Sequence, residues 1–398
     1  MATRASRRRR PLFLTLAVLF LGAAVAPRVD AAAPSWSVEI TPDGELFPVL
    51  DLSQRPPRST AAPGGGNGLV IVRVRGDDQP RHLSLEVSTP GLRAPARVEA
   101  DLGRHGTIEL RPRLEWDTEY LHALRTTSHQ SLRVSLAGGG PRVESRNVDV
   151  RVHPLDDALY FVREGKDRID LGWVFAAYVN PQDPVVDEIA ADAREVDEDF
   201  DRRATSADDR LRRVLSIWTT LVRHGLRYAA GDPALSRGPA IYSQRVRLLG
   251  DVWRERRANC LDGSVLIASV LERIGIPAFI ALVPGHAFVG YRADADHVEF
   301  LETTLLGEDT RARGAPDAVD DGLAVAANFE AARDAGRERW RRVSSRFERR
   351  HGPDYALIDI GAARSYGIIP FGPHGDGGQG GERTDPTAAG LPPENSPP

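Results

Sequence analysis

Residues 259–291 read NCLDGSVLIASVLERIGIPAFIALVPGHAFVGY, and residues 298–307 read VEFLETTLLG. The first stretch holds Cys260, the only cysteine of the chain. Apolar residues recur at helical spacing after Cys260, and Gly275 and Pro277 predict the end of that helix. Two apolar runs follow, the second beginning at His286, and a third ends at Glu302. The pattern predicts a helix and three strands that place a thiol, an imidazole and a carboxylate on different elements.

Cys260 is expected to begin its helix. The positive end of the helix dipole stabilises a thiolate at that position. The backbone N–H of the first helical residue has no partner within the helix, so it can bind a developing oxyanion. Both features suit a thiol nucleophile.

The strands that contain His286 and Glu302 are separated by a short polar turn. If they pair as a hairpin, Glu302 lies beside His286. A carboxylate bonded to one imidazole nitrogen fixes the tautomer and supports the imidazolium that forms when the thiol ionises. A lone cysteine is more often a core residue and a lone histidine more often structural, but the three together favour a catalytic site over an inactive one on the same fold.

Four short motifs carry a resemblance to a known family: Asn259-Cys-Leu-Asp262, Gly275-Ile-Pro277, Gly285-His286-Ala-Phe288 and Leu301-Glu302-Thr-Thr304. Their order and placement resemble the transglutaminase-like superfamily, whose members share a papain-like Cys-His-Asp arrangement. The resemblance covers about residues 211–307 and is closest to exported bacterial members with unassigned substrates. It implies an α+β class with a papain-like, transglutaminase-like core, in which the helix carrying the cysteine packs on an antiparallel sheet.

By this resemblance Cys260 is the nucleophile, His286 the general base and acid, and Glu302 the orienting carboxylate. The family usually has Asp where this chain has Glu302, and the longer side chain changes the geometry. Asp262 is expected to support the site without contacting substrate. For the oxyanion we expect the Cys260 backbone N–H, with Gln244 or Trp253 as candidate side-chain donors. No cofactor and no metal are expected.

Motifs for other chemistries are absent from the sequence. It has no G-x-S-x-G elbow, no H-E-x-x-H, no P-loop and no paired C-x-x-C. His224, His297 and His351 are scattered, without the spacing of metal ligands. The cysteine stretch is therefore the leading site.

Residues 1–31 are predicted to be a signal peptide. Five arginines precede an apolar run over residues 11–24, and small residues at 31–33 offer a cleavage site. The alternative is an uncleaved membrane anchor. We therefore expect a periplasmic or extracellular protein, and its single cysteine allows no internal disulfide. Removing this basic segment takes the net charge from −4 to near −9, which disfavours a nucleic-acid partner.

Two domains and a tail are predicted. Residues 34–152 contain short alternating strands separated by turn clusters, typical of an all-β sandwich-like domain, and we favour a packing spacer over a substrate-presenting module. Residues 153–371 would form the transglutaminase-like domain, with Trp218 and Tyr228 in its core. A helix expected over residues 323–346 is interpreted as an amphipathic surface helix rather than a lid. Residues 372–398 are expected to be disordered.

The leading hypothesis is thiol-dependent acyl transfer on amide bonds of peptides, proteins or peptidoglycan-like substrates through a thioester. Hydrolysis is favoured because water needs no dedicated acceptor site, and protein cross-linking is a second outcome of the same chemistry. The alternative from another class is a non-catalytic scaffold of the cell envelope with a vestigial site. The oligomeric state stays open.

Overall fold

The computed structural model describes residues 35–55, 62–138, 142–230, 235–236, 240–308, 321–347 and 355–372. The predicted signal peptide lies outside these residues, as does the predicted tail except for Gly372. Within them, no helix combines the length and apolar character needed to cross a membrane. The molecule contains both helices and several sheets, which confirms the mixed α+β class.

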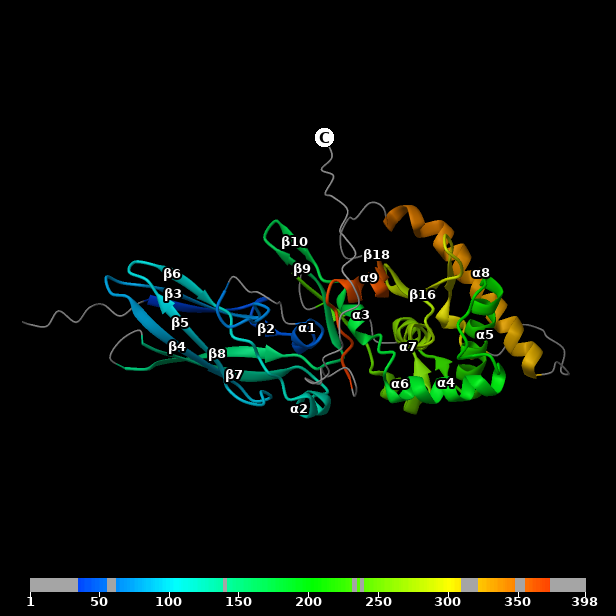
Figure 1. The fold of residues 1–398 in the computed structure, drawn as a ribbon, viewed down its shortest axis with the longest axis horizontal. Coiled ribbons are helices and arrows are strands. Elements are labelled where there is room, and N and C mark those ends of the chain that lie inside the picture. Colours follow the sequence, from blue (N-terminus) through cyan, green and yellow to red (C-terminus); the bar gives the residue numbers. More distant parts are fainter. Residues whose placement is uncertain are drawn as a thin grey trace, which may run out of the picture.

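The N-terminal half consists of two layered sheets (Figure 1). Alternation decides which face is buried: Leu83, Leu85 and Val87 of one strand are fully buried while their neighbours are not. The sheets, in strand order, are β1 (Ser35–Ile40), β3 (Val70–Arg75) and β6 (Thr107–Leu110), and β2 (Glu45–Leu46), β8 (Glu144–Val152), β7 (Ser128–Ala137), β4 (Arg81–Ser88) and β5 (Ala96–Leu102). Two short helices, α1 (Pro48–Leu52) and α2 (Thr118–Ala123), complete this half.

A second group of elements connects this half to the site. It includes a four-stranded sheet that contains, in order, β10 (Asp167–Asp170), β9 (Asp157–Glu164), β13 (Ile241–Arg245) and β12 (Leu235–Ser236). Three helices accompany it: α3 (Val174–Tyr178), α4 (Pro184–Val196) and α5 (Ala207–Arg223). A capping box between Ser206 and Asp209 fixes the start of α5, because each side chain accepts from the other's backbone N–H.

The third group carries the candidate site. An antiparallel sheet has the order β17 (Val298–Leu301), β16 (His286–Arg292), β15 (Ala278–Val283) and β18 (Ala356–Asp359). Helix α7 (Cys260–Arg273) packs against β15 and β16 (Figure 1). The remaining elements are β11 (Arg227–Tyr228), α6 (Leu249–Glu255), β14 (Arg257–Ala258), the 3-10 helix η1 (Thr303–Leu305), α8 (Asp321–Phe347) and α9 (Ile360–Ser365).

Helix α8 packs against β17, at the outer edge of this sheet (Figure 1). Gly336 makes the close approach, since a Cβ atom there would lie 2.3 Å from the backbone oxygen of Phe300. Arg337 also donates to both oxygens of Glu299, at 2.7 and 2.8 Å. Helix α8 keeps many exposed residues, as an amphipathic surface helix does, and it is also tied to the strand that leads into Glu302.

Contacts cross the predicted domain boundary at residue 152. The fully buried His153 lies between Glu45 and Asp157, with a distance of 2.8 Å from its Nδ1 to Asp157. Near the C-terminus, the N–H of Ile369 donates to the carbonyl of Ser53, at 2.8 Å. Residues before position 152 thus make polar contacts with residues just after it and with residues near position 369. The position of the domain boundary stays a prediction.

Candidate active site

Cys260 is the first residue of α7 and is half-buried. The Asn259 side chain caps this helix by accepting from the N–H groups of Leu261 and Asp262, at 2.9 and 2.8 Å. Asp262 returns the contact by accepting from the Asn259 N–H at 3.2 Å. No acceptor for the Cys260 N–H occurs in the described part of the chain, whereas its neighbours' N–H groups are used. That N–H is free to donate to a ligand at the sulfur.

Asp262 connects the start of helix α7 to the loop before α6. It is fully buried, and its two oxygens accept from the backbone N–H and the Nε of Arg247, at 2.9 and 3.0 Å. Arg247 also donates to Glu255 at 2.7 Å. Asp262 therefore fixes Cys260 against the loop before α6, and its carboxylate contacts the scaffold.

The carbonyl of Cys260 is held by two hydroxyls. Ser264 donates to it at 2.6 Å and Thr303 at 3.0 Å. Thr303 directly follows Glu302, and the close packing needs Gly263, where a Cβ atom would lie 3.3 Å from the Cβ of Thr303. The element that carries the carboxylate is thereby bonded to the residue that carries the thiol.

His286 begins β16, and Glu302 caps η1 directly after β17. The two strands pair antiparallel, and Nε2 of His286 lies 2.9 Å from Oε2 of Glu302. The other carboxylate oxygen accepts from Thr304, at 3.2 Å from its N–H and 2.9 Å from its hydroxyl. Because Nε2 is bonded to the carboxylate, Nδ1 is the ring nitrogen left for Cys260.

Arg339 of α8 is a further partner of this carboxylate. Its Nε donates to Oε2 of Glu302 at 2.7 Å, so the same oxygen binds both the arginine and His286. The Glu302 N–H also donates to the carbonyl of Ala332 at 3.0 Å. Glu302 is buried, and α8 holds it at both its backbone and its side chain.

Electrostatics favour an imidazolium beside a carboxylate. Burial disfavours the charged form of His286, but its contacts with Cys260 and Glu302 outweigh burial and raise its pKa to about 9. Burial would raise the pKa of Glu302, yet hydrogen bonds from His286 and Thr304 and the charges of His286 and Arg339 lower it. His286 is thus charged at neutral pH and can give a proton to a leaving group.

Tyr228 differs from its expected place in the core. It is 39% exposed, whereas Trp218 is buried as predicted, with its indole N–H donating to Asn328 at 2.9 Å. Burial and the charges of Cys260 and Glu302 raise the pKa of Tyr228. Tyr228 therefore lies at the open side of the site rather than beneath it.

The two candidate side-chain donors for the oxyanion each have a local partner in this structure. Gln244 lies on β13, in a different sheet from His286, and its amide donates to the carbonyl of Arg245 at 3.2 Å. The Trp253 indole donates to Glu188 at 2.8 Å, and its ring stacks on His224. Both donors satisfy local partners, and the backbone N–H of Cys260 remains as the free donor.

No group of three or more His, Cys, Asp or Glu residues that could hold a metal ion occurs in the described ranges. The arrangement around Cys260 is instead that of a thiol, an imidazole and a carboxylate, with one unused backbone donor. Chemically, this set can move a proton from sulfur to nitrogen and stabilise the resulting charges.

Comparisons with known proteins give little. The chain matches no protein-family model and no curated protein. Among solved structures it matches the crystal structure of red sea bream transglutaminase, with 10% identity and a TM-score of 0.21, over 66% of this chain and 54% of that one. The match spans about half the length of that structure, and a likeness this weak carries no argument about the site.

Proposed function

We propose that the chain is an exported thiol-dependent enzyme that transfers the acyl group of an amide to water through a Cys260-His286-Glu302 triad. The observation that carries the proposal is His286, which interacts with Cys260 and is bonded to the buried Glu302. A histidine held in this way has one ring nitrogen oriented by the carboxylate and the other available to the thiol.

The reaction follows from these positions. The thiol proton of Cys260 already resides on Nδ1 of His286 in an imidazolium–thiolate pair, and the sulfur of Cys260 bonds to the carbonyl carbon of the amide. The oxyanion accepts from the Cys260 N–H, and the imidazolium gives its proton to the nitrogen of the departing amine as the C–N bond breaks. Water then attacks the thioester with His286 as base, and the acid and free thiol are released.

Hydrolysis of peptide or peptidoglycan-type amides is the preferred outcome, because water needs no acceptor site. An amine attacking the same thioester would give cross-linking instead. The weak transglutaminase likeness does not choose between these outcomes. A non-catalytic scaffold is the alternative of another class, and it gives no reason for the shared oxygen that binds both His286 and Arg339.

Trapping with hydroxylamine tests the proposal. The chain lacking residues 1–31 is incubated with muropeptides or with casein peptides, and hydroxamates are measured by mass spectrometry, because hydroxylamine intercepts a thioester. We expect hydroxamates with the wild type and none with Cys260→Ala or His286→Ala. His297→Ala is the matched control, since His297 is exposed and pairs with Glu299 instead of the triad. Equal hydroxamate from Cys260→Ala, or none from the wild type with either mixture, would overturn the proposal.

A further inference from the structure

A polar cavity of about 380 Å³ adjoins the segment that precedes the nucleophile. Its lining includes Asn259, the residue before Cys260, and Ala229 and Ala230, which follow Tyr228. Arg125, from the N-terminal half, also lines it. A molecule in this cavity therefore lies next to the site and touches both halves of the chain.

Three of the four arginines that line the cavity are neutralised. Arg245 pairs with Asp156 at 2.8 Å, and Arg125 lies 3.4 Å from Asp251. Arg247 pairs with Asp262 and Glu255, as described above. The fourth, Arg257, is exposed and has no carboxylate partner anywhere in the described part of the chain.

A second unneutralised arginine stands beside it. Strands β11 and β14 pair in parallel with Arg227 opposite Arg257, so the two side chains leave the same face of the ribbon. Arg227 is also exposed, and no ion pair of its side chain occurs among the described residues. Like charges directly opposite one another in a sheet are destabilising, and an anion bound between them would relieve the repulsion.

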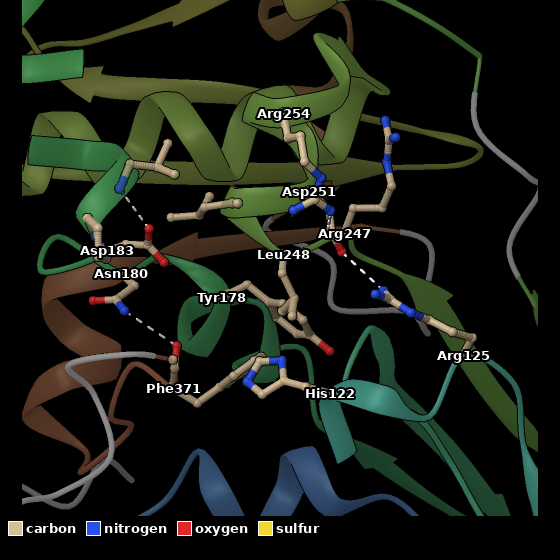
Figure 2. A pocket seen from close by; sticks show the side chains of 15 residues that line it. His122, Arg125, Tyr178, Asn180, Asp183, Arg247, Leu248, Asp251, Arg254 and Phe371 are labelled. Atoms are coloured by element: carbon tan, nitrogen blue, oxygen red, sulfur yellow. Dashed lines mark hydrogen bonds and ion pairs between the residues drawn. The ribbon is translucent and has the colours of Figure 1, made fainter. Parts of the chain in front are cut away.

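A neighbouring cavity is not lined by an arginine that lacks a carboxylate partner among the described residues. It has a volume of about 320 Å³ and is lined by apolar side chains such as Tyr178 and Phe371 together with polar and charged ones such as Asn180 and Asp183 (Figure 2). Arg254 and Arg125 both reach Asp251 there, and Arg247 is held by Asp262. Of these two cavities, the one beside Asn259 is lined by an arginine that has no carboxylate partner among the described residues.

We propose that Arg257, with Arg227 beside it, forms a subsite for a carboxylate of the substrate close to the scissile amide. This rests on the proposed function of Cys260. A guanidinium binds a carboxylate through two parallel hydrogen bonds, which orients as well as attracts it. The other charged residues of the cavity are paired with one another, so one unpaired guanidinium in the lining, that of Arg257, is left to balance a ligand charge, which matches a singly charged carboxylate better than a phosphate dianion.

The substrate class follows from this assignment. The enzyme would select peptides in which a free carboxyl, from a chain end or an acidic side chain, lies near the amide that is cleaved. The ion pairs of Arg125, Arg245 and Arg247 then fix the shape of the cavity, and Arg257 contacts the carboxylate of the substrate.

Paired alkylating reagents test the subsite without knowledge of the substrate. Iodoacetate and iodoacetamide react with the same sulfur and differ in that only iodoacetate bears a carboxylate. The ratio of their rates at Cys260 is measured for the wild type, Arg257→Gln and Arg254→Gln. Arg254 is the matched control because it is an exposed arginine on the preceding helix whose charge is paired with Asp251.

We expect Arg257→Gln to lower the ratio of the iodoacetate rate to the iodoacetamide rate about fivefold, and high salt to diminish this difference. Arg254→Gln should leave the ratio unchanged. An unchanged ratio in Arg257→Gln, or the same fall in both variants, would overturn the subsite. Stronger protection of Cys260 from iodoacetamide by phosphate than by acetate at equal concentration would overturn its assignment to a carboxylate. Failure of the proposed function would show differently, as an iodoacetamide rate that does not depend on His286.

Discussion

Replacing Glu302 by Gln removes the charge that lies 2.9 Å from the His286 ring while keeping the size of the side chain. Unit charges about 4 Å apart, at an effective dielectric constant of about 20, attract by about 4 kcal/mol. Raising the pKa of His286 from 6.5 to about 9 requires about 3 kcal/mol. The Glu302 charge is thus large enough to explain the rise, although burial opposes it and Cys260 contributes.

In Glu302→Gln we expect the pKa of His286 to fall to about 7 or below. Burial then dominates, and Arg339 repels the imidazolium without the intervening carboxylate. The assay is a titration of the imidazole resonances by NMR, with the His286 signal assigned by its absence in His286→Ala. Glu299→Gln is the matched control, since Glu299 lies on β17, just before Glu302, and pairs with α8 but makes no hydrogen bond to His286 or Cys260 among the described residues.

Glu302→Gln should also change how the unfolding free energy depends on pH. A raised pKa means that the imidazolium stabilises the fold, so this contribution is complete below pH 6.5 and is lost as the pH rises through about 9. The wild type should lose up to about 3 kcal/mol of unfolding free energy over that window through His286, and Glu302→Gln should lose much less. A pKa of His286 that stays near 9 in Glu302→Gln would refute the reasoning.

Other predictions concern the scaffold around the triad. Arg339→Gln should slow Cys260 alkylation by about three- to tenfold at neutral pH, because Glu302 loses a charged donor, whereas Arg337→Gln on the same helix should not; equal effects would contradict this. Gly336→Ala should lower the unfolding free energy in urea by about 1–3 kcal/mol, since its Cβ would collide with the β17 backbone, while Gly250→Ala, with open space around it, should not destabilise. Asp262→Ala should cost about 3 kcal/mol, because the Nε of Arg247 and the backbone N–H groups of Arg247 and Asn259 lose their buried acceptor, and a cost below about 1 kcal/mol would show that this anchor is unimportant.

The helix and strands of the site could be predicted from the sequence, because each is marked by residues within the element itself. Helical spacing after Cys260 and the glycine at 275 correctly bound α7 to within two residues. The strand beginning at His286 is also found as predicted, and the next strand ends one residue before Glu302 rather than at it. The closeness of the imidazole and the carboxylate follows from the hairpin register of the structure; the sequence predicts it only on the condition that the two strands pair.

The contribution of α8 could not be read from the sequence. Arg339 is 37 residues beyond Glu302 and is one of many arginines in a charged helix, so nothing local marks it as the one that reaches the carboxylate. The tight approach at Gly336 is likewise a tertiary contact.

The wrong expectation for Tyr228 has a similar cause. Tyr228 has a large aromatic side chain of the kind that often lies in a core, but it is on a two-residue strand at the surface. Gln244 was a candidate for the oxyanion because it precedes Cys260 in the chain, as a papain-type glutamine does, and Trp253 was a further option; that order along the chain does not determine where β13 and α6 direct their side chains. Sequence separation predicts a donor only when the fold between the two residues is known.

The pH profile of Cys260 alkylation tests the central claim most directly. Iodoacetamide is reacted with the chain lacking residues 1–31 between about pH 5 and pH 9, and the only cysteine makes the product unambiguous. The account predicts a rate that reaches a plateau already at the acidic end, and His286→Ala should abolish that plateau while His297→Ala retains it. A profile in which Cys260 reacts like an ordinary free thiol, or reacts only after unfolding, and is the same in His286→Ala, would contradict it.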